Sequence, residues 1–172
     1  HTFQGDSLAA LDDGLEPRNS GDQDLPRFTW WDHRGTEEWV QLEFPQAQEV
    51  SEVAVYWFDD TGRGQCRIPK SWEVLHRDGD QWKPGTVKSA EPVAKDRWNR
   101  QTFEPLTTSA LRINVELQPD DSGGILEVRV KQLRRRAENC TPCRAPTTFR
   151  QRPAHPYPAH PRPPPLPRPA RQ

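Results

Sequence analysis

The stretch ALRINVEL, residues 110–117, decides the fold class, because apolar and polar residues alternate along it with a period of two. This period is typical of a β-strand with one buried and one solvated face. The same alternation occurs in residues 39–44 and 125–131, and further strands are expected at 72–77 and near Phe103. No segment shows a sustained apolar period of 3.6 residues, so we predict an all-β protein.

Turn-forming residues separate these runs at residues 62–64, 84–85, 105, 119 and 123–124. Asp78-Gly79-Asp80 predicts a hairpin in which Trp82 begins the returning strand. Several short strands joined by polar loops favour an antiparallel β-sandwich. Residues 53–58 differ because both of their faces are apolar, which indicates a strand covered on both sides or packed against another domain.

The charge of the chain is divided between two parts. Residues 1–130 carry 14 Lys and Arg against 24 Asp and Glu, a net charge of −10, whereas residues 131–172 carry 10 Lys and Arg against one acidic residue, a net charge of +9. We therefore predict a residual linker at 1–6, a β-sandwich module at 7–132 and a disordered Pro/Arg-rich tail at 133–172. An acidic body disfavours nucleic acid as a partner, and no apolar run approaches the roughly 20 residues of a membrane helix.

Residues 133–172 allow more than one interpretation. A P-x-x-P pattern within residues 162–168 suits an SH3-like groove, yet Pro-rich segments produce it by chance, and translation outside the natural reading frame would also give this composition. Cys140 and Cys143 form half of a zinc motif without its second ligand pair, so we interpret them as incidental thiols.

Six segments, taken in order, carry a resemblance to a known family. They are LAALDDG (8–14), FTWW (28–31), GTEEWVQLEF (35–44), VYWFDD (55–60), CRIPKSW (66–72) and SGGILE (122–127). Together they resemble the C-terminal sandwich of large bacterial glycoside hydrolases of the β-L-arabinofuranosidase type. More distantly, they are similar to coagulation-factor type C (discoidin) and galactose-binding-like modules, whose fold is a jelly-roll sandwich.

The resemblance implies an accessory module whose catalytic domain, with its cysteine nucleophile and metal, belongs to another part of the same longer chain. It also implies an extracellular or periplasmic location. Cys66 is then a structural thiol, since no His is placed by the sequence to act as its base. Phosphate-cradling loops, nucleophile elbows and metalloprotease motifs are absent from the sequence, so we expect no catalytic residues.

A glycan site requires aromatic faces for stacking, with charged or amide groups for the hydroxyls. The chain offers such residues in three polar loops, and our candidates are Trp31, His33, Asp60, Arg67 and Trp98. Packing is the alternative role for each loop Trp, and adjacent Trp30 and Trp31 cannot both face solvent in an extended chain. Trp39, Trp57 and Trp72 lie on predicted strands and are assigned to the core.

The resemblance further implies one structural calcium ion, held between the early Asp-Gly loop and the last strand. Asp13, Ser20 and Glu127 are the candidate ligands, because calcium requires six to eight oxygen atoms. The alternative is a simple Asp-Gly turn with an exposed strand glutamate. Two functions follow from the sequence: a glycan-binding or bracing accessory module of a glycoside hydrolase, and a discoidin-type protein-interaction module with the Pro-rich tail as a peptide ligand.

Overall fold

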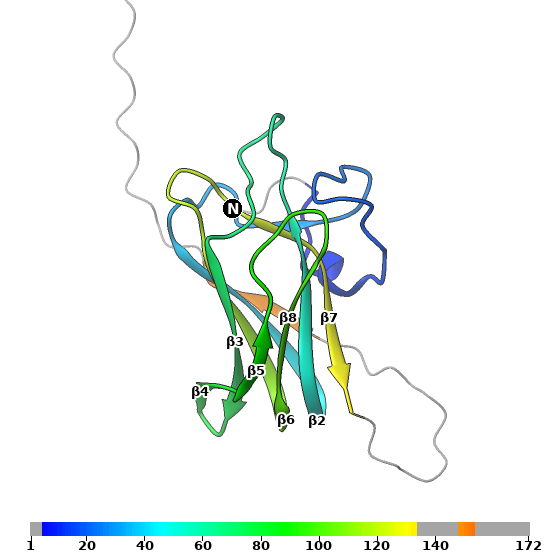
Figure 1. Cartoon of the computed structure of the whole chain (residues 1–172), viewed down its shortest axis with the longest axis vertical. Coiled ribbons are helices and arrows are strands. Elements are labelled where there is room, and N and C mark those ends of the chain that lie inside the picture. The colour runs from blue at the N-terminus through cyan, green and yellow to red at the C-terminus, as the bar shows by residue number, and fades with distance from the viewer. Residues whose placement is uncertain (1–4, 134–147, 154–172) are drawn as a thin grey trace, which may run out of the picture.

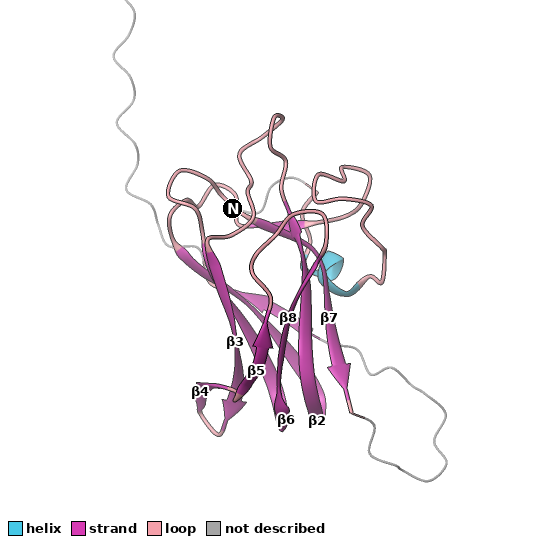
Figure 2. Cartoon of the chain, in the orientation of Figure 1, coloured by secondary structure: helices cyan, strands magenta, loops and turns pink. Residues whose placement is uncertain are grey.

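The protein is an antiparallel β structure in the computed structural model, which describes residues 5–133 and 148–153 (Figures 1 and 2). Its elements are the 3-10 helix η1 (Leu8–Asp12) and the strands β1 (Phe28–Thr29), β2 (Glu37–Phe58), β3 (Ser71–Asp78), β4 (Gln81–Pro84), β5 (Val87–Ala90), β6 (Trp98–Glu116), β7 (Gly124–Gln132) and β8 (Thr148–Gln151). The predicted all-β class is confirmed. In the described part of the chain, no helix has the length and apolar character needed to cross a membrane.

Two long strands, β2 and β6, run through both layers of the structure. They pair with each other along most of their length, with a break in register between Glu43 and Gln48. Before the break, β2 also pairs with β8, and β6 continues to β3 and β4. After it, β2 pairs with β7 and β1 lies beyond, while β5 pairs with β6. The chain therefore forms two layers joined through the same two bent strands.

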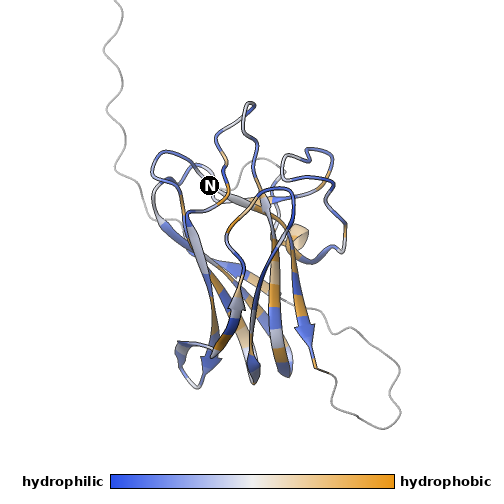
Figure 3. Ribbon diagram, viewed as in Figure 1, coloured by the Kyte–Doolittle hydropathy of each residue, from blue (hydrophilic) through white to orange (hydrophobic). Residues whose placement is uncertain are grey.

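The core lies between these layers and follows the period-two pattern (Figure 3). Leu111 and Ile113 are fully buried, whereas Arg112 and Asn114, which alternate with them, lie on the outer face. Leu111 and Ile113 pack with Val55 and Trp57 of the other layer in one apolar cluster. Each such side chain contributes about 1.5–3 kcal/mol by leaving water. The alternation at 39–44 and 110–117 thus correctly predicts which face of each strand is buried. At 125–130 it holds only in part, because Leu126 lies in a separate apolar cluster and Glu127, expected on the solvated face, is 1% exposed.

Trp39 is a correction to the predicted core. Trp57 and Trp72 belong to the core cluster, but Trp39 is half-buried on the outer face, where the guanidinium of Arg112 lies 4.1 Å from its ring centroid. The reason is the same alternation that predicts the strand. Val40 and Leu42 point inward, so their neighbour Trp39 must point outward.

The outer face of residues 53–58 is covered by this chain itself. Tyr56 and Phe58 form a second apolar cluster with Cys66 and Leu126, against which Leu25 and Trp98 pack. Arg27 also lies over the ring of Phe58, at 4.7 Å. Cover from another domain is therefore not needed to explain why both faces of this strand are apolar.

Strand β8 falls within residues 133–172, the segment assigned to the tail. Its Phe149 pairs with Leu42 of β2 and packs against the core. A single aromatic residue within four residues gives too little periodicity to predict a strand, and pairing with the edge of β2 supplies the missing stabilisation. The remaining tail predictions, including Cys140, Cys143 and the P-x-x-P pattern, lie outside the described residues.

Candidate functional site

A pocket of about 390 Å³ lies among loops at one end of the sandwich, at the upper end of Figure 1. The N-terminal segment, the loop after β1 and the loop after β2 supply its walls. We call it the loop pocket, and it is lined by Gln23, Arg27, Thr29, Trp31, Phe58, Asp60, Arg63, Gly64, Gln65 and Cys66. Volumes of this size suit small ligands such as one or two sugar rings.

Trp31 contributes an aromatic ring to the lining of this pocket. Its ring is half-buried, and the Arg34 guanidinium lies 5.2 Å from the ring centroid and donates a hydrogen bond to Gln65. Its neighbour Trp30 is buried and packs edge-to-face on Phe28, with the centroids 5.3 Å apart. The expectation that only one of the two adjacent indoles faces solvent is confirmed.

Asp60 lines the pocket but also organises the loop that forms its wall. Its Oδ1 accepts a hydrogen bond of 2.8 Å from the backbone N–H of Cys66 and lies 3.5 Å from Nη1 of Arg67. Any larger residue at Gly64 would displace this carboxylate, because a Cβ atom there would lie only 2.1 Å from Oδ2 of Asp60. The carboxylate is therefore folded against its own loop.

The neighbouring Asp59 is buried and anchors the base of this loop. It accepts hydrogen bonds from Nζ of Lys95 at 2.8 Å and from the backbone N–H groups of Thr61 and Ile68 at 3.0 Å. Burial alone would raise the pKa of Asp59, but the bonds from Lys95, Thr61 and Ile68 together hold it below its usual range. Asp59 is therefore a charged structural anchor.

The structure brings together only part of the predicted glycan site. Trp31 and Asp60 line the loop pocket, and Arg67 contacts Asp60 from outside the lining, bridging to Asp121 at 3.6 Å. His33 is 2.7 Å from Oε1 of Glu38 and does not line the pocket. Trp98 lies on the covered outer face, where its Nε1 donates to Glu16 at 2.9 Å.

The candidates from the sequence did not include several polar lining residues, among them Gln23, Arg27, Arg63 and Gln65. Gln65 has a signal in the sequence, since it lies between the candidates Asp60 and Arg67. Gln23 and Arg27 have none, because only the fold returns the N-terminal segment to the end of β2, where Asp59 N–H donates to the carbonyl of Ser20 at 2.8 Å.

The predicted calcium ligands are only partly gathered. Glu127 is 1% exposed, and burial, followed by a hydrogen bond with Asp13, raises its pKa to about 8. Its Oε2 atom is buried without a partner, which suits a cation. Ser20 instead exchanges two hydrogen bonds of 2.8 Å with Asp96. Of the three predicted ligands, the structure therefore brings Asp13 and Glu127 together and leaves Ser20 apart, and among the described residues no three His, Cys, Asp or Glu side chains cluster as metal ligands.

Cys66 is buried at the edge of the loop pocket. Burial, with the negative charges of Asp60 and Asp6, raises the pKa of its thiol to about 12. A thiol with this pKa remains protonated near neutral pH and is a poor nucleophile. Its environment therefore suits a structural role.

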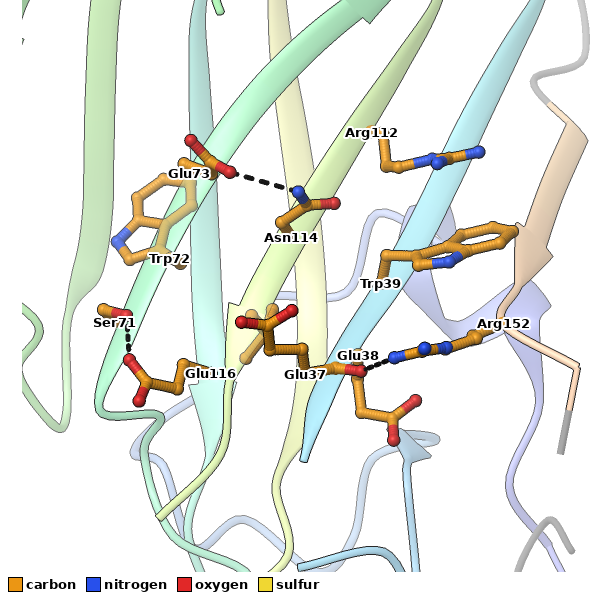
Figure 4. Close-up of a pocket in the computed structure, with 11 residues that line it drawn as sticks. Glu37, Glu38, Trp39, Ser71, Trp72, Glu73, Arg112, Asn114, Glu116 and Arg152 are labelled. Atoms are coloured by element: carbon orange, nitrogen blue, oxygen red, sulfur yellow. Dashed lines mark hydrogen bonds between the residues drawn. The ribbon is translucent and has the colours of Figure 1, made fainter. Parts of the chain in front are cut away.

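A second hollow, of about 470 Å³, lies on the outer face of β2, β6 and β3 (Figure 4). We call it the sheet groove. Arg112 lies between the rings of Trp39 and Trp82, at 4.1 and 4.2 Å from their centroids. Other polar groups along the groove bind one another: Asn114 donates to Glu73 at 3.1 Å, and Ser71 donates to Glu116 at 2.9 Å. The groove therefore offers fewer free hydrogen-bonding groups than its composition suggests.

Comparison with known proteins identifies the class of fold. No family model matches this sequence, and no curated protein sequence matches it. A solved structure from work on the Streptococcus pneumoniae beta-galactosidase BgaA is 22% identical, with a TM-score of 0.63 over 75% of this chain and 86% of that one. A GH31 CBM32 module bound to GalNAc is 12% identical, with a TM-score of 0.51 over 75% of this chain and 89% of that one.

These likenesses show that the chain has the β-sandwich fold found in carbohydrate-binding modules associated with glycoside hydrolases. At these identities the likeness concerns the fold, and a site must be argued from the residues of this chain.

Proposed function

We propose that the chain is a non-catalytic, glycan-binding accessory module, and that the loop pocket is its binding site. The observation that carries the proposal is the half-buried indole of Trp31 in a pocket of about 390 Å³ that also contains amide and guanidinium groups. Sugars present C–H surfaces to aromatic rings and hydroxyl groups to such donors. The carbohydrate-binding class of its structural neighbours supports the same conclusion.

The carboxylates near the pocket favour binding over hydrolysis. Glycoside hydrolysis uses two carboxyl groups about 5–9 Å apart that flank the scissile bond. Here Asp59 is buried and bonded to Lys95, while Asp60 is held by Cys66 N–H and Arg67. Both are therefore engaged in loop structure. From the resemblance of the sequence, we propose that this module accompanies a catalytic domain of the β-L-arabinofuranosidase type in a longer chain.

We favour glycan binding over a bracing role because the outer face of 53–58 is covered by residues of this chain, Leu25 and Trp98 among them. The protein-interaction alternative depends on the Pro-rich residues 153–169. Binding of protein ligands through that segment, with no glycan bound by the body, would support the alternative.

The test is glycan-array screening followed by calorimetric titration of the wild-type chain, Trp31→Ala and Trp39→Ala. Loss of one stacking ring should weaken binding at least about tenfold, so we expect this loss for Trp31→Ala. Trp39→Ala is the matched control, because Trp39 is a half-buried tryptophan of the sheet groove. Binding lost in Trp39→Ala and kept in Trp31→Ala would move the site to the groove. Absence of any glycan binding would refute the proposal.

We also propose one structural calcium ion at Asp13 and Glu127. The unpartnered Oε2 of Glu127 and its hydrogen bond with Asp13 support a site in which calcium replaces the shared proton. Calcium would neutralise the buried carboxyl group of Glu127 and the exposed one of Asp13, and would join the loop after η1 to β7.

A further inference from the structure

Charge is distributed unusually around the loop pocket. The body of the chain is acidic, with a net charge of −10 over residues 1–130, yet the ionisable lining residues include Arg27 and Arg63 against the single carboxylate of Asp60. Arg34 adds a third guanidinium beside Trp31. The pocket is thus a local concentration of positive charge on an acidic molecule.

The negative charge of Asp60 is already compensated within its loop. Its Oδ1 accepts from Cys66 N–H and lies 3.5 Å from Arg67, and its Oδ2 lies against the Cα of Gly64. Arg67 does not line the pocket. Asp60 therefore contributes little repulsion toward an anion bound beside Trp31.

Of the guanidinium groups of Arg27, Arg34 and Arg63, the last two have no ionic partner among the residues that the structure describes. Arg27 is 3.8 Å from Oδ1 of Asp6. Arg34 bonds to the neutral Gln65, and the side chain of the exposed Arg63 has no hydrogen bond or ion pair within residues 5–133 and 148–153. Most other basic residues of the body are paired with carboxylates, among them Arg18, Lys70, Lys83, Lys88, Lys95 and Arg129.

We propose that the loop pocket selects glycans that carry a carboxylate, and that Arg63 is the residue that recognises it. This inference rests on the proposed glycan-binding function. A planar guanidinium matches a carboxylate with two parallel hydrogen bonds, which a neutral sugar hydroxyl does not provide. Trp31 then supplies the face on which the ring of the acidic sugar stacks, and Arg34 adds a second positive charge beside it.

The sheet groove provides an internal contrast. Its lining includes four glutamates against Arg112 and Arg152, so its charge disfavours an anionic ligand. The glutamates are the exposed Glu37 and Glu73, the half-buried Glu116 and the buried Glu38. Both arginines of the groove are already engaged. Arg112 lies between the indoles of Trp39 and Trp82, and Arg152 donates a hydrogen bond to the carbonyl of Glu37. An acidic glycan should therefore bind in the loop pocket in preference to the sheet groove, whereas the charge of the two hollows gives a neutral glycan no such preference.

The experiment compares acidic and neutral sugars of matched structure by calorimetric titration with the full chain. One pair is a glucuronyl disaccharide and its glucosyl counterpart, and the other is sialyllactose and lactose. We expect at least one acidic sugar to bind about tenfold more tightly than its neutral partner, as a charge-assisted hydrogen bond provides. The pair that shows the preference identifies which acidic sugar supplies the carboxylate.

Arg63→Gln should weaken binding of the acidic sugar more than that of the neutral sugar and so remove most of this preference, because glutamine can still donate a hydrogen bond to a hydroxyl group but carries no charge. Arg77→Gln is the matched control, because Arg77 is an exposed arginine that stacks on Trp82 outside both hollows. A preference that persists in Arg63→Gln, or that disappears equally in Arg77→Gln, overturns the role of Arg63. Equal binding of acidic and neutral sugars, with both lost in Trp31→Ala, overturns carboxylate selection and leaves the glycan-binding function intact. Absence of binding to every sugar is instead a failure of the proposed function.

Discussion

At the residue scale, Glu127 is the carboxyl group whose burial most affects its chemistry. Its pKa is raised from 4.5 to about 8, first by burial and then by Asp13. The folded state therefore keeps a proton that the unfolded state releases between these two pH values. The free energy of unfolding should fall as pH rises from about 4.5 to 8, by up to about 1.4 kcal/mol per pH unit, and should not recover above pH 8.

Glu127→Gln should flatten this pH dependence, because an amide needs no proton to be neutral. Denaturant unfolding in the presence of a chelator at pH 5, 6, 7 and 8 measures the free energy of unfolding of the wild-type chain and of Glu127→Gln. Added calcium at pH 8 should raise the melting temperature of the wild-type chain and leave that of Glu127→Gln unchanged. Ser20→Ala is the informative comparison, since Ser20 bonds to Asp96 and its replacement should not abolish the calcium response. An identical pH profile in wild type and Glu127→Gln would contradict the assignment.

Single residues also show how far the sequence could predict the candidate site. Alternation limits the solvent-facing choice to one of Trp30 and Trp31, and the structure selects Trp31. The short spacing of the candidates Asp60 and Arg67 predicts that they lie in one loop, and in the structure they are 3.5 Å apart. The opposite wall could not be predicted, because Gln23 and Arg27 reach the pocket only through long-range folding of the N-terminal segment. Trp98 appears as a loop residue in the sequence, but it packs on Tyr56 at 5.5 Å.

At the scale of elements, β8 is held to β2 mainly through Phe149. This ring packs against the core, whereas Arg150 on the opposite face forms an exposed ion pair of 3.4 Å with Glu43. Phe149→Ala should lower the free energy of unfolding by about 1–2 kcal/mol, less than for a fully buried ring. Arg150→Ala should change it by less than about 1 kcal/mol. Chemical unfolding followed by tryptophan fluorescence measures both, and equal small effects would show that β8 adds no stability.

Alternation predicted parts of the long strands β2, β6 and β7, but it did not predict their continuity. Pro105 was predicted to lie in a turn, but it lies inside β6. It falls between Thr102 and Leu106, where the pairing of β6 with β2 shifts in register. Proline is tolerated in a strand where the ladder is interrupted. Pro45 similarly lies within β2 at the break between Glu43 and Gln48. Periodicity describes short runs, and it cannot show that a bend joins two of them into one long strand.

At the scale of the whole molecule, the sharing of β2 and β6 between both layers predicts cooperative unfolding. Neither layer can separate without breaking the strands that build the other. Ile113→Ala, a change in the common core, should cost about 2–5 kcal/mol and should destabilise both layers together. Far-ultraviolet circular dichroism and tryptophan fluorescence should report one coincident transition in wild type and variant. Two separated transitions would contradict this coupling, and Glu73→Ala provides a surface control.

Residues of this chain cover Tyr56 and Phe58, and this has a practical consequence for engineering. The shortest fragment that can be transferred to another protein must include the residues before β1. Leu25 and Arg27 cover the apolar side chains of Tyr56 and Phe58, which would otherwise be exposed and promote aggregation. A graft onto a different enzyme that began at Phe28 would lose Leu25 and Arg27 and would tend to self-associate. The fusion joint should therefore precede the 3-10 turn at Leu8.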